Sequence, residues 1–476
     1  MPIPEALAAA YDPEQFRRDG HALIDVLADY LGRASRGQLP VLERADPAAL
    51  TREYATDFAS PQPAALAALA ARALERVNHL HHPRYVGHQV TAPLPEAALL
   101  ELVSALSNNG AAVFEMGTLE VAMERALVRF MSDAVGFGES ADGVFTSGGS
   151  AGNLTALLAL RQSHAGSDVW RNGLGGELPC VLVSEQAHYS VKRALQIIGF
   201  GEGGVELVPA DERFKLRPEL LPEAERRARA RGRKVIGVAA SSGSTATGAY
   251  DPLEPIAAFC EERGLWLHVD GAHGAAAALS PRLRPLLAGA ERADSLVWDA
   301  HKMLLMPALV TAVLFRDGKR SYEPFAQSAS YLFGDVHPEE EWYNFASRTL
   351  ECTKRWMALP LYTALSRRGA GFFATYVEHM AELGATFAAL LREAPDFELA
   401  VPPELNIVCF RYVPREHSPA ELDRLQERVR RAVVDSGQFY LVQTRLTSGI
   451  HLRTTLINPL TSEGDLVDLL AAIRAA

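Results

Sequence analysis

Residues 265–270 read LWLHVD, an apolar run of strand length that ends on the acidic residue Asp270. A carboxylate is costly to bury without a partner, so its position at the end of this run indicates a ligand. Continuously apolar runs separated by helix-like stretches are typical of a mainly parallel sheet with helices on both faces, an α/β fold. Six further runs fit this pattern: GVF at 143–145, CVLVSE at 180–185, VELVP at 205–209, KVIGVAA at 234–240, SLVWD at 295–299 and VTAVLF at 310–315.

The chain divides into three parts around these runs. Asp12-Pro13-Glu14 has the residue types that cap and begin a helix, and a second helix is predicted over 63–77. No strand run accompanies these helices, so 1–89 is predicted to be a helical extension, packing on a partner subunit or on its own domain. The large α/β domain is predicted over 90–370. A small α+β domain is predicted over 371–476, with strands at 407–413, 439–442 and 450–455.

Composition excludes several classes of protein. The 476 residues are 48% apolar and 22% charged, which is enough for a large core in two or three domains. The formal net charge of −11 argues against nucleic acid and anionic membrane surfaces as partners. No run approaches the roughly 20 apolar residues that cross a bilayer, and the N-terminus lacks a basic leader. We expect a soluble, cytoplasmic protein.

The four cysteines, Cys180, Cys260, Cys352 and Cys409, form no CxxC pair. Neither a structural zinc site nor a disulfide framework is therefore indicated. We expect reduced and mostly buried thiols.

Ligands of such sheets bind beyond the carboxyl ends of the strands, so the residues after each run are the candidate site. The first run is followed by TSGGSAGN at 146–153, where small residues precede a helix whose free N–H groups would face an anion. This pattern favours a phosphate cradle, and a flexible turn is the alternative. The stretch matches neither a Walker A motif nor GxGxxG, so nucleotide binding is not favoured.

The remaining strand ends carry polar side chains. His188 either stacks on a planar ligand or caps a helix, and SSGSTATGAY at 241–250 is a polar loop. Asp270 would be satisfied by a protonated ring nitrogen or by a metal held with His268 and His273, the latter making a metal-dependent hydrolase. Lys302 follows a buried strand and precedes the apolar run 303–306, an unusual place for a solvated lysine. An anion site, a stacking ring, a buried acid and a nucleophilic lysine together meet the needs of pyridoxal 5′-phosphate.

These motifs resemble those of the group II pyridoxal-phosphate-dependent amino-acid decarboxylases of fold type I, which include aromatic-amino-acid, glutamate and 2,4-diaminobutyrate decarboxylases. The resemblance extends from about His82 to Pro459 and is carried by TSGGSAGNL, SEQAHYSVKRA, HVDGAHG and DAHK. It implies pyridoxal 5′-phosphate as cofactor and a homodimer with the active site at its interface. It also implies conversion of an L-amino acid to its amine and CO2. An aldehyde synthase or a carbon–carbon lyase on the same fold is the alternative.

The resemblance also implies roles for individual residues. Those that would bind the cofactor are Gly149 and Ser150 at the phosphate, His188 stacked on the ring, Thr245 near the ring hydroxyl or substrate carboxylate, Asp270 at the ring nitrogen, Ala272 against the ring, His301 at the phosphate and Lys302 in the Schiff base. Arg453 would hold the substrate α-carboxylate. Tyr331 would lie on a loop and return a proton to Cα. The catalytic residues would thus be Lys302, Asp270, His188 and Tyr331.

One stretch differs from the family pattern, and another is expected to select the substrate. Asp299-Ala300 stands where many relatives have Asn-Pro, and a carboxylate would be repelled by a phosphate. We therefore expect Asp299 to turn away or to bond to a backbone N–H. In HPRYVGHQ at 82–89, Arg84, His88 and Gln89 favour a substrate with a polar or acidic side chain. The alternative for Arg84 is a salt bridge with a neighbouring helix.

Overall fold

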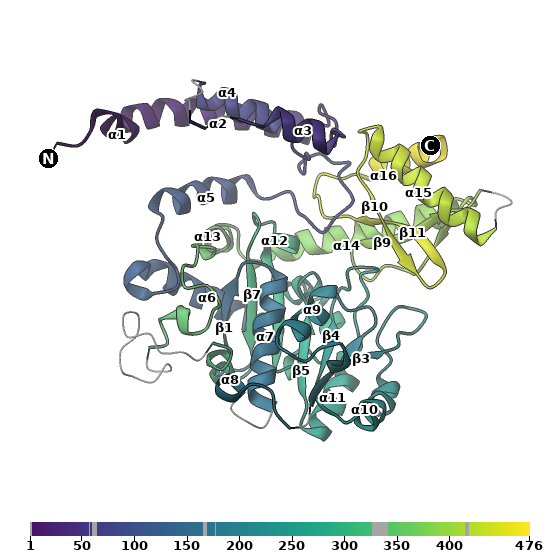
Figure 1. Cartoon of the computed structure of the whole chain (residues 1–476). Helices are drawn as coiled ribbons and strands as arrows, with labels where there is room; N and C mark the ends of the chain where they lie inside the picture. Colours follow the sequence, from purple (N-terminus) through teal and green to yellow (C-terminus); the bar gives the residue numbers. More distant parts are fainter. Residues whose placement is uncertain are drawn as a thin grey trace.

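The computed structural model describes residues 2–56, 58–59, 64–164, 169–176, 178–325, 341–414 and 418–476. Two sheets organise these residues: a seven-stranded sheet in the body and a four-stranded sheet nearer the C-terminus (Figure 1). The first lies within the range predicted for the large domain and the second within that of the small domain. The domain boundaries themselves stay a prediction.

All seven predicted runs form strands of the large sheet. Their order is β1-β7-β6-β5-β4-β2-β3, and β3, β2, β4, β5 and β6 pair in parallel, whereas β7 runs antiparallel to both of its neighbours. The expectation of a mainly parallel sheet is confirmed, with one reversed strand. The strands are β1 (Asp142–Thr146), β2 (Leu178–Ser184), β3 (Val205–Val208), β4 (Arg233–Ser241), β5 (Trp266–Asp270), β6 (Ser295–Asp299) and β7 (Thr311–Phe315).

Helices cover both faces of this sheet, as the apolar runs predict. Side chains alternate across β6: Leu296 and Trp298 pack into the core on one face and Val297 into the core on the other. The face of Val297 is covered by α7 (Gly149–His164) and α9 (Tyr189–Ile197), which contribute apolar side chains to the same core. The opposite face is covered by α6 (Thr118–Val135), α10 (Leu221–Ala230) and α11 (Leu253–Arg263). Two short helices complete this part of the chain: α8 (Val169–Asn172) follows α7, and α12 (Ala300–Met303) follows β6.

The N-terminal helices extend away from the sheets, along one side of the molecule (Figure 1). They are α1 (Glu5–Ala10), α2 (Pro13–Ser35), α3 (Pro47–Glu53) and α4 (Leu66–Leu74), followed by α5 (Pro95–Ser107). Asp12 caps α2 by accepting the N–H groups of Glu14 and Gln15, as predicted. The second helix is shorter than the predicted 63–77. Ala34 is the one buried residue that α1 to α4 contain in the described part of the chain, so this extension has no core of its own.

The small C-terminal sheet is antiparallel, in the order β10-β11-β9-β8. The strand predicted at 439–442 was wrong: Tyr440 instead makes an isolated bridge with Tyr85, and β10 begins only at Val442. The three-residue β8 was not predicted because it is too short to show a pattern. The elements are α13 (Ala358–Arg368), α14 (Ala370–Glu393), β8 (Phe397–Leu399), β9 (Ile407–Tyr412), α15 (Pro419–Asp435), β10 (Val442–Leu446), β11 (Gly449–Thr455) and α16 (Glu463–Ala475).

The cysteines are all free thiols; Cys180, Cys260 and Cys409 are buried and Cys352 is exposed, as expected for a chain without disulfides. In the part of the chain that the structure describes, no helix is both long and apolar enough to span a membrane.

Candidate active site

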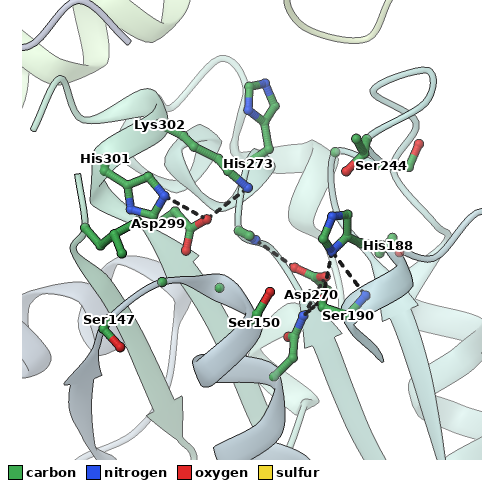
Figure 2. Close-up of a pocket in the computed structure, with 18 residues that line it drawn as sticks. Ser147, Ser150, His188, Ser190, Ser244, Asp270, His273, Asp299, His301 and Lys302 are labelled. Carbon is green, nitrogen blue, oxygen red and sulfur yellow. Dashed lines mark hydrogen bonds and ion pairs between the residues drawn. The ribbon is translucent and has the colours of Figure 1, made fainter. Parts of the chain in front are cut away.

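A cavity of about 270 Å³ lies at the carboxyl edge of the large sheet. Its walls come from the loops that follow β1, β2, β4, β5 and β6, which the parallel arrangement brings together. Figure 2 shows the labelled side chains converging on this space from different strands. The lining residues are Ser147, Gly148, Gly149, Ser150, Asn153, His188, Ser190, Ser241, Gly243, Ser244, Thr245, Asp270, Ala272, His273, Asp299, His301, Lys302 and Leu309.

Asp270 closes β5 and carries its carboxylate into the cavity, where it is only 8% exposed. Asn153 Nδ2 donates to its Oδ2 at 3.0 Å, and the backbone N–H of Ala272 donates to its Oδ1 at 3.2 Å. Both donors are neutral, and no described lysine or arginine forms an ion pair with it. A buried carboxylate satisfied only by neutral donors favours a cationic ligand.

The metal-hydrolase alternative is wrong. Both ring nitrogens of His268 are occupied, Nε2 by Asn153 Oδ1 at 3.0 Å and Nδ1 by Ser295 Oγ at 2.9 Å. His273 Nε2 bonds to Asn406 Oδ1 at 2.8 Å. No group of three or more histidines, cysteines or carboxylates suited to a metal is found among the described residues. Burial lowers the pKa of His268 to about 4 and that of His273 to about 3, so both are neutral near pH 7.

Lys302 lies on α12 with its Nζ 2.9 Å from Asp299 Oδ2 (Figure 2). Asp299 also accepts the Thr311 hydroxyl at 2.5 Å and lies 3.5 Å from His301 Nε2. The expectation that Asp299 turns away or bonds to a backbone N–H is therefore wrong. Its carboxylate faces the cavity because a lysine, a histidine and a hydroxyl surround it. The apolar residues after Lys302 pack into the core and do not enclose its amine.

The loop between β1 and α7 is the stretch predicted to cradle a phosphate, and it lines the cavity. Gly148 has φ of +117°, which glycine tolerates best, and α7 begins at Gly149. A side chain at 149 would meet the Asp299 carboxylate at 3.1 Å, so glycine keeps this space open. Ser150, Ala272 and His301 line the same cavity. The structure thus brings together the residues predicted to surround a phosphate and a ring.

His188 lies at the end of the loop after β2, beside Asp270 (Figure 2). Its Nδ1 is 2.7 Å from Ser190 Oγ and caps the first turn of α9, so the helix-cap alternative is confirmed. The ring also lines the cavity, so stacking on a planar ligand stays a prediction compatible with the cap. Burial, partly offset by the charge of Asp270, lowers the pKa of the His188 imidazole. A neutral ring at this place offers a flat face to the cavity.

Thr245 connects the cavity to the small domain. Its carbonyl accepts Arg453 Nη1 at 2.5 Å, which places the predicted carboxylate-binding arginine next to the cavity wall. The Arg453 guanidinium is buried, its Nε has no hydrogen-bond partner, and no described carboxylate pairs with it. Burial lowers the pKa of Arg453.

The predicted substrate residues at 84–89 separate into two groups. His88 stands with its ring 5.5 Å from that of Tyr440, and the charges of Arg453 and Arg430 add to burial in lowering its pKa. Gln89 Nε2 is buried without a partner. Arg84, by contrast, is engaged with Asp465 at 3.0 Å and Asp468 at 2.5 Å on α16, so the salt-bridge alternative holds and the substrate prediction for Arg84 was wrong.

One predicted catalytic residue, Tyr331, lies outside the described residues. Three residues without a predicted role border the site: Asn153 and Ser190 beside Asp270, and Thr311 beside Asp299. Asn153 and Ser190 lie within the motifs that carry the family resemblance, so the sequence placed both near the site. It did not predict that Asn153 would bond to Ser190 and Asp270. Thr311 carried no signal, because only the reversed strand β7 places its first residue at this edge.

Comparison with known proteins identifies the family of this site. Residues 73–413 match the model of the pyridoxal-dependent decarboxylase conserved domain. The chain is 29% identical over 470 residues to the aromatic-L-amino-acid decarboxylase of Bacillus atrophaeus, covering 97% of this chain and 95% of that protein. It is 31% identical over 409 residues to the cysteine sulfinic acid decarboxylase of Rattus norvegicus, covering 83% and 82%.

Solved structures agree with these matches. The crystal structure of mouse CSAD in its apo form superposes with a TM-score of 0.91 at 25% identity, covering 98% of this chain and 99% of that chain. The predicted α/β fold of type I is thereby confirmed.

The neutral state of His268 predicts a loss of stability in acid. The ordinary pKa of 6.5 applies to the unfolded chain and about 4 to the folded one, so the unfolded chain binds the additional proton as the pH falls between them. Stability from this group is complete above pH 6.5 and should fall by about 2–3 kcal/mol at pH 4.5. We expect urea unfolding of His268→Gln to be less sensitive to this pH change than that of the wild type. Equal pH slopes for the two proteins would contradict the assignment.

Proposed function

The chain belongs to the pyridoxal-dependent decarboxylase family and is therefore a carboxy-lyase of amino acids with pyridoxal 5′-phosphate as its cofactor, and we propose that its substrate has a polar or acidic side chain. The observation that carries this proposal is the polar lining of the cavity, in which Leu309 is the one large apolar residue among the described lining residues.

The residues of the cavity fit the cofactor. Asp270 is a buried carboxylate that pairs with no lysine or arginine of the described residues, which matches a protonated pyridine nitrogen. The space kept open by Gly149, the N–H groups at the start of α7 and the neighbouring His301 suit a phosphate. Lys302 would hold the cofactor covalently through Nζ, and His188 and Ala272 would face the two sides of its ring. Asp299 would remain paired with His301 and Thr311 beside the phosphate.

The chain's own groups would then orient the substrate for loss of its carboxylate. The bound cofactor supplies an electron sink for the electron pair that the departing CO2 leaves behind. Asp270 would keep a proton on the ring nitrogen, because an adjacent carboxylate favours the cationic form. Arg453 would bind the α-carboxylate with the N–H groups that the Thr245 carbonyl does not use. Asp299 would accept a hydrogen bond from the Lys302 amine when that amine is free.

The chemistry of the walls supports a polar or acidic side chain. Hydroxyls, glycines, histidines and charged groups line the cavity, and Leu309 is the one large apolar residue among its described lining residues. The charges of Arg430 and Arg453 both act on His88, so this end of the site is electropositive. An indole would gain little from such walls, whereas an acidic group would find donors. The similarity to a cysteine sulfinic acid decarboxylase points in the same direction.

We also propose that two copies of the chain form a homodimer. Four large apolar residues on one face of α5 are about half exposed or more, Leu99, Leu102, Val103 and Leu106. Their spacing of three and four residues makes a continuous stripe. The neighbouring extension α1 to α4 has almost no buried residues of its own. An apolar face of this kind is expected to be covered by a second subunit.

Lys302→Ala provides the direct test of the reaction. The wild type should bind pyridoxal 5′-phosphate with a visible absorbance band and release CO2 and an amine from a panel of L-amino acids, with acidic and polar members fastest. Lys302→Ala should lose both the band and turnover. An aldehyde with ammonia in place of the amine would contradict simple decarboxylation, and preference for tryptophan would contradict the substrate class.

Arg453→Met should lower kcat/KM, because it removes the proposed partner of the substrate α-carboxylate. Loss of a charged hydrogen-bonding partner of the α-carboxylate costs roughly 2–4 kcal/mol, so kcat/KM should fall by about 30-fold to 1000-fold. Arg84→Met is the matched control, because its guanidinium pairs with Asp465 and Asp468 instead, and it should change kcat/KM by less than about threefold. Equal losses in the two variants would remove Arg453 from this role.

Leu102→Glu combined with Leu106→Glu should dissociate the homodimer. A carboxylate on each of these exposed positions would be costly to bury in an interface but harmless to a monomer's surface. Light scattering after gel filtration should give twice the chain mass of 51.6 kDa for the wild type and a lower mass for the variant. A wild type of single chain mass would contradict the proposal.

A further inference from the structure

We propose that Asn153 and His268 are positioning residues for the cofactor, which fix the Asp270 carboxylate and the His188 ring through one continuous chain of buried hydrogen bonds. The chain joins Trp266, Ser295, His268, Asn153 and then both Asp270 and Ser190, and it ends on His188. The inference rests on the proposed roles of Asp270 and His188 toward the cofactor.

The chain begins deep in the core and reaches the cavity floor. Trp266 Nε1 bonds to Ser295 Oγ at 2.9 Å, and Ser295 Oγ lies 2.9 Å from His268 Nδ1. His268 Nε2 lies 3.0 Å from Asn153 Oδ1. Trp266, Ser295, His268 and Asn153 are each no more than 1% exposed. Water therefore does not compete for any of these bonds, and each group depends on the next.

At Asn153 the chain divides. The Nδ2 of Asn153 donates to Asp270 Oδ2 at 3.0 Å and to Ser190 Oγ at 2.9 Å. Ser190 Oγ in turn lies 2.7 Å from His188 Nδ1 (Figure 2). One side-chain amide is thus shared by the carboxylate below the proposed ring nitrogen and by the residue proposed to stack on the ring.

The direction of these bonds follows from Asp270, because a carboxylate can only accept. Asn153 therefore presents Nδ2 to Asp270 and Oδ1 to His268. Since an amide oxygen can only accept, the neutral His268 ring carries its proton on Nε2, and its Nδ1 accepts the hydroxyl proton of Ser295, which itself accepts from the Trp266 indole. The Ser190 backbone N–H donates to His188 Nδ1, so this nitrogen is an acceptor and the Ser190 hydroxyl also donates to it. His188 accordingly carries its proton on Nε2 and stays neutral.

His268 can orient Asn153 in this way only while its imidazole is neutral. An imidazolium at this place would partly neutralise Asp270, and its Nδ1 could no longer accept the Ser295 proton. Burial lowers the pKa of His268 to about 4, so a neutral ring supplies the donor at ordinary pH. The negative charge of Asp270 then stays available to the cofactor, while its position is fixed by the amide.

The test measures cofactor binding to the full chain in the absence of any amino acid. Apoprotein is titrated with pyridoxal 5′-phosphate, and the dissociation constant and the visible circular dichroism of the bound cofactor are recorded. The variants are Asn153→Ala, His268→Phe, which keeps a ring without the N–H, and His268→Gln, which keeps an amide donor. Gln426→Ala is the matched control, since Gln426 is a fully buried amide bonded to the Tyr412 backbone in the small domain.

We expect Asn153→Ala and His268→Phe to raise the dissociation constant by about tenfold or more and to reduce the visible circular dichroism, because Asp270 or its donor loses a hydrogen bond. His268→Gln should stay within about threefold of the wild type. Gln426→Ala should lower the unfolding temperature and leave cofactor binding unchanged. Should Asn153→Ala not fold, the comparison of His268→Phe with His268→Gln decides.

Three results would overturn the proposal. They are wild-type binding and dichroism in His268→Phe, equal weakening in His268→Gln and His268→Phe, or weakening in Gln426→Ala equal to that in Asn153→Ala. Because no substrate is present, a failure here is distinct from a failure of the proposed substrate class, which the amino-acid panel tests.

Discussion

The site depends on a buried negative charge that no lysine or arginine of the described residues neutralises. Asp270 ends an interior strand, and within the described residues its carboxylate receives hydrogen bonds only from the Asn153 amide and the Ala272 N–H. Such an arrangement is expensive for the protein alone and is stabilised once a positively charged ring nitrogen arrives. The neutral state of His268, the shared amide of Asn153 and the neutral ring of His188 all preserve this unmatched charge.

Strand runs and cavity residues were predictable because both follow from local sequence. Each apolar run formed a strand, and the parallel pairing of β2, β4, β5 and β6 brings the residues after them to one edge. The end of β1 shares this edge because β7 runs antiparallel to both β1 and β6. The failures concern pairings between distant residues. Arg84 was predicted to bind the substrate, but it pairs with Asp465 and Asp468, which lie far along the chain and could not be recognised as its partners from the sequence. Asp299 was expected to turn away because a phosphate would repel its carboxylate. Its contact with Thr311 could not be predicted, because that contact depends on the antiparallel pairing of β6 with β7.

The substrate end of the site joins three parts of the chain. The segment around Tyr85 to His88 lies along Tyr440, and the Val86 carbonyl accepts the N–H of Thr455. Arg453, on the strand that ends at Thr455, reaches the Thr245 carbonyl in the loop after β4. The four-stranded sheet is therefore joined to the cavity loop through Arg453, the arginine proposed to bind the substrate carboxylate.

The reversed strand β7 has a further consequence for Lys302. Asp299 and Thr311 face each other in register on adjacent antiparallel strands, so residues 300–310 form a connection clamped at both ends instead of a crossover between parallel strands. Because both ends of this connection are held by the sheet, the position of Lys302 is constrained by the fold itself.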